Sequence, residues 1–217
     1  MPDKPRWTLL HHNLAAHKLT AMRDGATSAK HFRRLMHQMG LLLCSEMTRD
    51  LPLGMGKPII TPEKNEALNA RLDQSELVVM PILRSGLPLG DAFLELLPNA
   101  RVGHIGIYRD EENEHHCYML SLPRERTATF FVLDPAITRG DTPSMAVDYL
   151  LRGGVPAENI RFGCLIASTE GLERFYADER FHAVKIYTFC DTDRLDDRSF
   201  LVPGMGNIGQ RLFRTQE

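Results

Sequence analysis

Three residues suited to phosphate and sugar chemistry each stand directly after a short apolar run. Arg84 and Arg109 carry planar guanidinium groups, whose forked N–H donors match the oxygens of a phosphate or diphosphate. Asp134 adds a carboxylate, which can face sugar hydroxyls or a metal ion. This combination predicts a site for a phosphorylated sugar and its metal.

A turn rich in hydroxyl residues follows Asp134. It contains Thr138, Gly140 and Thr142, and it leads into Pro143, a residue that favours the first turn of a helix. Free backbone N–H groups at a helix start, aided by the helix dipole, bind anions. The turn therefore predicts a phosphate cradle, or else a plain strand-turn-helix corner with a capping threonine.

Short apolar runs alternate with helical patterns along the chain, and these elements must position the site. Strands are expected at 77–83, 102–108, 129–133, 161–167 and 183–189. Helices are expected from Thr27 or Ser28 to about Met47, from 87 through 97, at 143–151 and at 170–176. Apolar strands separated by helix-length crossovers are typical of a parallel sheet covered on both faces. The predicted fold class is α/β, residues 1–217 form a single domain, and ligands are expected beyond the carboxyl ends of the strands.

Composition excludes several classes of protein. The 217 residues include 26 Lys and Arg against 28 Asp and Glu, a net charge of −2, which argues against a general nucleic-acid binder. No apolar run approaches the roughly 18 residues needed to cross a bilayer, and the first 19 residues lack the apolar core of a secretory signal. Four widely spaced cysteines match neither a disulfide framework nor a zinc site. A cytoplasmic protein without nucleic-acid or membrane partners is expected.

One segment carries a family resemblance. Residues 134–142, Asp-Pro-Ala-Ile-Thr-Arg-Gly-Asp-Thr, resemble the loop that uracil phosphoribosyltransferases carry as Asp-Pro-Met-Leu-Ala-Thr-Gly-Gly-Ser. The stretches 17–19, 22–24, 81–87, 100–109 and 202–209 resemble the same family in the same order. The resemblance runs from about His12 to Phe213, nearly the whole chain.

The resemblance implies transfer of the ribosyl 5-phosphate group from 5-phosphoribosyl 1-diphosphate (PRPP) to uracil, giving UMP and diphosphate. It implies a parallel α/β core with a small C-terminal base-binding hood, a homodimer, and Mg²⁺ carried by PRPP without a direct protein ligand. The implied PRPP-binding residues are Arg84, Arg109, Asp134, Pro135, Ala136, Ile137, Thr138, Arg139, Gly140, Asp141, Thr142 and Asn207. The implied uracil-binding residues are Leu201, Gly206, Asn207 and Ile208.

The resemblance also assigns roles within this set. Arg84 and Arg109 contact the diphosphate end, Asp134 faces the ribose hydroxyls, and residues 138–142, the phosphate loop, wrap the 5-phosphate. Leu201 and the turn 206–208 contact the base through backbone groups. The charged stretch 109–114 has a simpler interpretation as a solvated hairpin, and Arg23 one as a surface charge.

The phosphate loop departs from the family pattern. Arg139 and Asp141 replace a threonine and a glycine, and a carboxylate about 5 Å from a doubly charged phosphate would be repelled by roughly 6 to 7 kcal/mol at an effective dielectric of 20. Either Asp141 caps the following helix while Arg139 compensates the phosphate, or the two side chains pair with each other. We expect the first arrangement.

The base-recognition end departs as well. Asn207 and Ile208 replace the usual Asp and Ala, and Thr192 replaces an Asp. Ser168 and Thr169 replace the Ala-Pro of the usual Ala-Ala-Pro-Glu-Gly. Two alternatives therefore stand beside the uracil transferase: a catalytically weak or inactive nucleotide-binding relative, and a transferase for another base.

Overall fold

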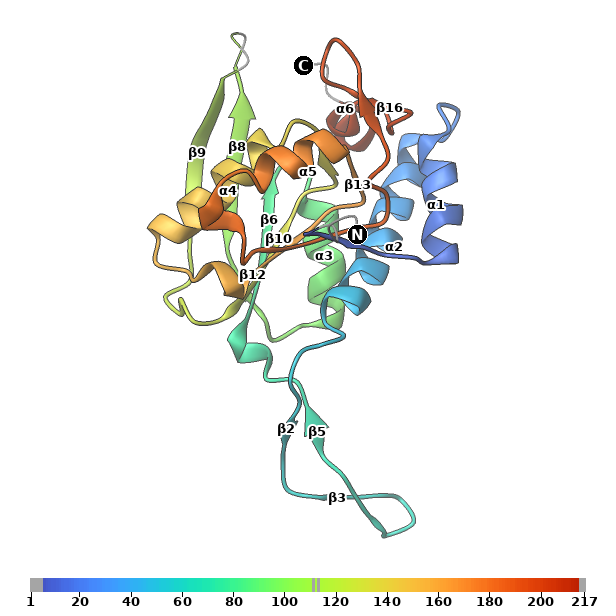
Figure 1. The fold of residues 1–217 in the computed structure, drawn as a ribbon. Coiled ribbons are helices and arrows are strands. Elements are labelled where there is room, and N and C mark those ends of the chain that lie inside the picture. Colours follow the sequence, from blue (N-terminus) through green and yellow to red (C-terminus); the bar gives the residue numbers. More distant parts are fainter. Residues whose placement is uncertain (1–5, 111, 113, 215–217) are drawn as a thin grey trace, which may run out of the picture.

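The structure is a computed structural model that describes residues 6–110, 112 and 114–214 (Figure 1). Within these residues one sheet contains, in spatial order, β1 (Thr8–Leu9), β14 (Lys185–Thr188), β12 (Ile160–Gly163), β10 (Thr129–Leu133), β6 (Leu77–Leu83), β8 (His104–Arg109) and β9 (His115–Ser121), with β7 (Arg101–Val102) also beside β6. All neighbours are parallel except β8 and β9. The predicted α/β class is confirmed.

Helices cover both faces of this sheet. One side of α1 (Asn13–Arg23), α2 (Ala29–Met47) and α3 (Leu87–Leu96) joins the core on one face of the sheet. One side of α4 (Asp141–Arg152) and α5 (Thr169–Phe175) joins the core on the other face. Side chains alternate between the faces of a strand, so Phe131 and Leu133 of β10 join the first core while Phe130 and Val132 join the second. Strands buried on both faces explain why these runs are apolar throughout.

The start of α2 follows directly from its sequence. Ser28 is the N-cap, and its hydroxyl accepts a hydrogen bond from the backbone N–H of His31 at 3.3 Å. The apolar side chains of Phe32, Met36 and Leu43 on this helix are fully buried. Among the described helices, none is long and apolar enough to cross a membrane.

Two predictions about the sheet are wrong. Residues 161–167 form two strands, because the chain leaves β12 and pairs as β13 (Ile166–Ala167) with β11 (Ala136–Ile137) next to the phosphate loop. A helix-length crossover does not separate β8 from β10; β9 returns beside β8 in antiparallel pairing, with His115 opposite Arg109. Since β9 is an edge strand, most of its side chains are exposed, and the apolar pattern of a buried strand is absent.

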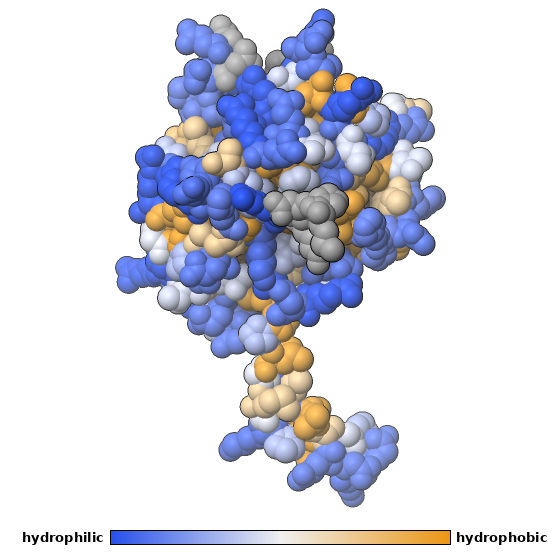
Figure 2. Space-filling model, in the orientation of Figure 1, coloured by the Kyte–Doolittle hydropathy of each residue, from blue (hydrophilic) through white to orange (hydrophobic). Residues whose placement is uncertain are grey.

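Residues 51–73 form an arm that projects from the body (Figure 1). In the arm, β2 (Gly54–Met55) pairs with β5 (Ala70–Arg71), and β3 (Ile59–Ile60) pairs with β4 (Glu66–Ala67). Apolar residues gather along it (Figure 2), and the side chains of Leu53, Met55, Ile60 and Leu68 are all exposed. The arm buries little apolar surface of its own, in contrast to the sheet and its helices.

The last segment closes over one end of the sheet. This hood (residues 191–213) contains the antiparallel pair β15 (Arg194–Leu195) and β16 (Leu201–Val202), followed by α6 (Ile208–Phe213). Helix α6 packs against α2, where the Arg33 guanidinium donates to the carbonyl of Leu212 at 2.7 Å. The hood and the β8–β9 hairpin lie at the end of the molecule opposite the arm (Figure 1).

Candidate active site

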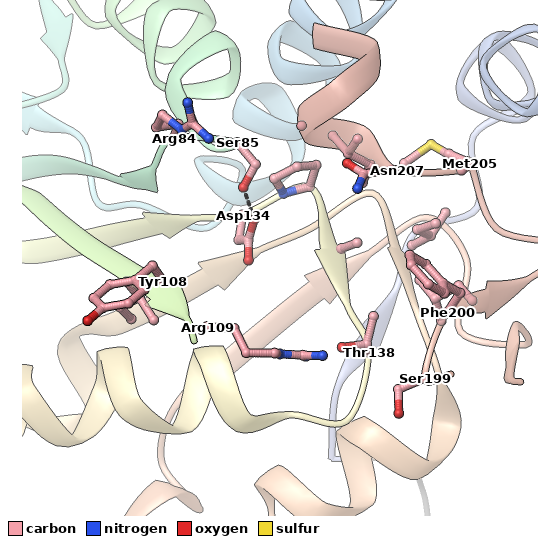
Figure 3. A pocket seen from close by; sticks show the side chains of 18 of the residues that line it. Arg84, Ser85, Tyr108, Arg109, Asp134, Thr138, Ser199, Phe200, Met205 and Asn207 are labelled. Carbon is pink, nitrogen blue, oxygen red and sulfur yellow. Dashed lines mark hydrogen bonds between the residues drawn. The ribbon is translucent and has the colours of Figure 1, made fainter. Parts of the chain in front are cut away.

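A cavity of about 740 Å³ lies between the carboxyl ends of β6, β8 and β10 and the hood (Figure 3). Several predicted site residues line it together: Arg84, Arg109, Asp134, Pro135, Ala136, Thr138, Leu201, Gly206, Asn207 and Ile208. The remaining ones do not line it: Ile137, Arg139, Gly140, Asp141 and Thr142. The sheet thus supplies Arg84, Arg109 and Asp134, and the hood supplies Arg198 together with apolar side chains and backbone groups.

Asp134 lies at the floor of the cavity, directly after β10. Its side chain is almost fully buried, and it accepts a hydrogen bond from the Ser85 hydroxyl at 2.8 Å (Figure 3). Burial raises the pKa of Asp134 to about 7, and the hydrogen bond from Ser85 opposes this rise. Near neutral pH this carboxyl group therefore exchanges readily between its acceptor-only ionised form and a protonated form that can donate.

The two arginines lie at the mouth of the cavity and are exposed to solvent. Arg109 ends β8 and extends toward Thr138 of the phosphate loop, as Figure 3 shows. Arg84 follows β6, and its guanidinium group lies 5.7 Å from the centre of the Phe213 ring in the hood. Both side chains are positioned to receive an anionic ligand that enters from solvent.

The phosphate loop rests on the first turn of α5. The Ser168 hydroxyl, which caps α5, donates to the carbonyl of Thr138 at 2.5 Å and accepts from the N–H of Gly171 at 2.9 Å. Gly140 has a φ of +85°, and a Cβ there would lie 2.5 Å from the Gly171 carbonyl. A Cβ on Gly171 would lie 1.9 Å from the Thr138 carbonyl. Both glycines are therefore needed for this close approach.

Asp141 points away from the main cavity. One of its carboxylate oxygens lies 3.2 Å from Nε of Arg139, and the other lies 2.9 Å from a terminal nitrogen of Arg174 on α5. The side chain lines a second cavity, of about 390 Å³, on the outer side of the loop. The expectation that Asp141 caps α4 is wrong, because Gly140 is the N-cap and has no side-chain cap. The pairing with Arg139 is present, and Arg174 is a partner that the sequence did not indicate.

The turn 204–207 of the hood is held by Asn207. Its side-chain oxygen accepts from the N–H of Gln210 at 3.0 Å and so caps α6. This cap leaves the side-chain NH₂ group for other partners. Gly204 and Gly206, on either side of Met205, both have positive φ, which gives the turn its tight backbone path.

A buried ion pair joins the hood to α1. Two nitrogens of the Arg23 guanidinium donate to the two oxygens of Asp193, at 2.9 and 2.8 Å, and the Asp193 side chain is 1% exposed. Arg23 also donates to the Gly204 carbonyl, and the Gly204 N–H donates to Asp193, both at 3.0 Å. Burial alone would raise the pKa of Asp193, but the Arg23 guanidinium holds it below its usual range. Arg23 is therefore more than a surface charge.

Several cavity residues were not predicted: Ser85, Tyr108, Tyr118, Arg198, Ser199, Phe200, Met205 and Phe213. Ser85 follows Arg84 and Phe200 precedes Leu201, so their positions beside predicted residues could have indicated that they line the cavity. Tyr118 comes from β9, whose antiparallel return was itself missed. Figure 3 shows Phe200 and Met205 across the cavity from Tyr108, which adds large apolar surfaces to a site otherwise defined by charge.

Comparison with known sequences decides the family. The model of the uracil phosphoribosyltransferase family matches residues 9–215. The chain belongs to the uracil phosphoribosyltransferase family. A uracil phosphoribosyltransferase of Ralstonia pickettii is 39% identical over 216 residues, which cover 99% of this chain and 98% of that protein. One of Burkholderia thailandensis is 38% identical over 217 residues, covering 98% and 96% respectively. The predicted resemblance is confirmed.

Solved structures share the fold of this chain. The AQ2163 protein from Aquifex aeolicus is 32% identical and superimposes with a TM-score of 0.87, covering 96% of this chain and 98% of that one. An adenine phosphoribosyl transferase from Trypanosoma brucei shares the fold alone, with 13% identity and a TM-score of 0.56 over 92% of this chain and 89% of that one. These likenesses support the α/β fold described above.

Proposed function

We propose that this protein transfers the 5-phosphoribosyl group of PRPP to N1 of uracil, forming UMP and releasing diphosphate. The observation that carries the proposal is the convergence of sheet-end and hood residues on one cavity. Arg84, Arg109, Asp134 and Thr138 supply charge and hydrogen bonds from one side, and Leu201 and the turn 206–208 supply backbone groups from the other. Such a two-sided cavity suits a reaction that joins a sugar phosphate to a flat base.

The proposed mechanism depends on alignment and on charge stabilisation. The bond between C1 of the ribose and the diphosphate oxygen breaks, the bond between C1 and N1 of the base forms, and the N1 proton is released. C1 becomes oxocarbenium-like as diphosphate leaves. Arg84 and Arg109 stabilise the departing negative charge, while Asp134 binds the ribose hydroxyls and fixes the sugar in line with the base. No covalent enzyme intermediate is required.

We expect Mg²⁺ to enter this site bound to PRPP. In the described part of the chain, no group of three or more His, Cys, Asp or Glu side chains is placed to hold a metal ion. The diphosphate and ribose of PRPP themselves offer oxygen ligands of the kind that Mg²⁺ prefers. Asp134, the acidic side chain that lines the main cavity, is assigned to the ribose hydroxyls. When bound, the ion neutralises charge on the leaving diphosphate.

A homodimer in a reducing compartment is part of the proposal. The arm exposes Leu53, Met55, Ile60 and Leu68 away from the body, and a second copy of the chain would cover this apolar surface. The four cysteines are free thiols, which supports a cytoplasmic setting.

One assay separates the proposed reaction from its alternatives. Purified protein is incubated with PRPP, Mg²⁺ and a panel of pyrimidine and purine bases, and diphosphate release is measured. Release with uracil supports the proposal, and release with another base alone reassigns the acceptor. No release with any base, combined with nucleotide binding by calorimetry, would identify a catalytically inactive relative.

A further inference from the structure

The altered phosphate loop contains Asp141, whose carboxylate would be repelled by the proposed phosphate ligand. Two arginine side chains restrain this carboxylate. Asp141 faces the second cavity, whereas Thr138 lines the main one. The carboxylate is held there from two sides, by Arg139 within the loop and by Arg174 on α5. We propose that Arg174 is a positioning residue: it holds the Asp141 carboxylate away from the ribose 5-phosphate, so that Arg139 remains available to that phosphate. This inference rests on the proposed function.

The two arginines differ in what they can do. Arg139 belongs to the loop, so it can turn toward a phosphate only by giving up its contact with Asp141. Arg174 contacts the other carboxylate oxygen, at 2.9 Å, and keeps Asp141 restrained when Arg139 leaves. Without Arg174, Arg139 would have to serve both the carboxylate and the phosphate. The Asp141 carboxylate would then be free to move closer to the phosphate and repel it.

Helix α5 provides a firm base for this restraint. The same helix holds the loop backbone through Ser168 and through the close approach of Gly171 to Thr138. Arg174 follows Gly171 by three residues, so it stands almost one turn further along the same face. The loop backbone and the loop acid are thus both tied to one element, which keeps their relative position constant.

The test is a set of variants measured for PRPP and uracil separately. Arg174→Ala should raise the KM for PRPP about threefold to fivefold, with kcat and the KM for uracil changed less than twofold. Arg174→Lys should retain most of the wild-type value. In the Asp141→Asn background the added Arg174→Ala change should have an effect below twofold, because the charge to be restrained is gone.

A matched control removes an equivalent ion pair elsewhere. Arg152 on α4 pairs with Asp148 at 2.8 Å and is mostly exposed, so Arg152→Ala loses a similar contact without touching the loop. Its KM for PRPP should equal that of the wild type. Thermal unfolding of every variant shows whether each one is folded.

Two results overturn the inference alone: an Arg174→Ala protein with the wild-type KM for PRPP, or one whose loss is equally large with Asn at position 141. Calorimetric titration with PRPP separates this from failure of the proposed function. A wild-type protein that binds PRPP without turnover contradicts the transferase, and the dissociation constants of the variants then decide the role of Arg174. A wild-type protein that neither binds PRPP nor turns over overturns both.

Discussion

The Ser168 hydroxyl donates a 2.5 Å hydrogen bond to the Thr138 carbonyl and thereby joins α5 to the phosphate loop. Ser168 is almost fully buried and also caps its own helix through the N–H of Gly171. A single hydroxyl therefore fixes both the start of α5 and the backbone of the phosphate loop. This contact links the packing of the fold to the proposed binding of PRPP.

Ser168→Ala is expected to lose both contacts. We expect a loss of about 1 to 2 kcal/mol in the free energy of unfolding and a rise of several-fold in the KM for PRPP. Ser28→Ala is the matched control, because Ser28 caps α2 with no contact to the loop. It should lose similar stability with an unchanged KM. Equal KM values for the two variants would contradict a role of Ser168 in the loop.

Gly171→Ala tests the close approach of α5 to the loop. The added Cβ would lie 1.9 Å from the Thr138 carbonyl, so the loop has to move outward. We expect PRPP turnover to fall at least tenfold while the circular dichroism spectrum remains that of a folded protein. Gly25→Ala serves as the control, since a Cβ there meets nothing within 4 Å. Unchanged kinetics in Gly171→Ala would show that the loop tolerates displacement.

Asp134→Asn tests the buried carboxyl group through the pH dependence of stability. Because burial raises its pKa to about 7, the folded protein keeps the proton between pH 4 and 7 while the unfolded chain releases it. Wild-type stability should therefore fall across this window, by up to about 4 kcal/mol, and level off above it. The Asn variant lacks this fall. Urea unfolding of the ligand-free proteins from pH 5 to 8 measures the difference. If the free energies of unfolding of the wild type and the Asn variant change with pH in parallel, the raised pKa of Asp134 is refuted.

Arg23→Ala leaves the buried Asp193 carboxylate without its main partner. We expect a loss of about 3 kcal/mol in stability and a higher KM for uracil, because the hood loses its connection to α1. Adding Asp193→Asn should recover part of the stability. Arg49→Ala, which breaks an exposed ion pair with Glu46, should cost less than about 1 kcal/mol. Similar losses of stability in Arg23→Ala and Arg49→Ala would argue against a stabilising role of the Arg23–Asp193 ion pair.

Ile60→Glu tests the arm as a surface between two copies. Ile60 is 65% exposed in one chain, and a charge there would disfavour its burial against a partner. Sedimentation velocity should show monomers for this variant and dimers for the wild type. Leu14→Glu, an equivalent change on the exposed face of α1, should leave the dimer intact. A wild-type monomer would refute the dimer itself.

The central strands were predictable because both of their faces are buried. The runs 77–83 and 129–133 match β6 and β10 in full, and Ser28 marks the start of α2. Strand β9 was not predictable in this way, because an exposed edge strand carries polar and apolar residues without a buried pattern. The path of the chain after β12 was not predictable either, because it depends on the pairing of β13 with β11, a segment distant in the sequence.

The site was predictable where residues follow strand ends and less so where distant residues meet. Arg84, Arg109 and Asp134 come directly after apolar runs, so their convergence follows from the sheet. The ion pair between Arg23 and Asp193 joins residues 170 positions apart, and nothing local to either residue indicates it. The contact of Asp141 with Arg174 is of the same kind.

The order of the site segments along the chain has a consequence for biosynthesis. Every residue expected to bind the sugar phosphates, apart from Asn207, has been translated once Thr142 is added to the chain, whereas residues 201–208, which are expected to contact the base, are added later. The donor half of the active site is thus encoded early and the acceptor half late. A nascent chain is expected to join the two substrates only after its hood has docked onto α1 and α2, which are translated much earlier.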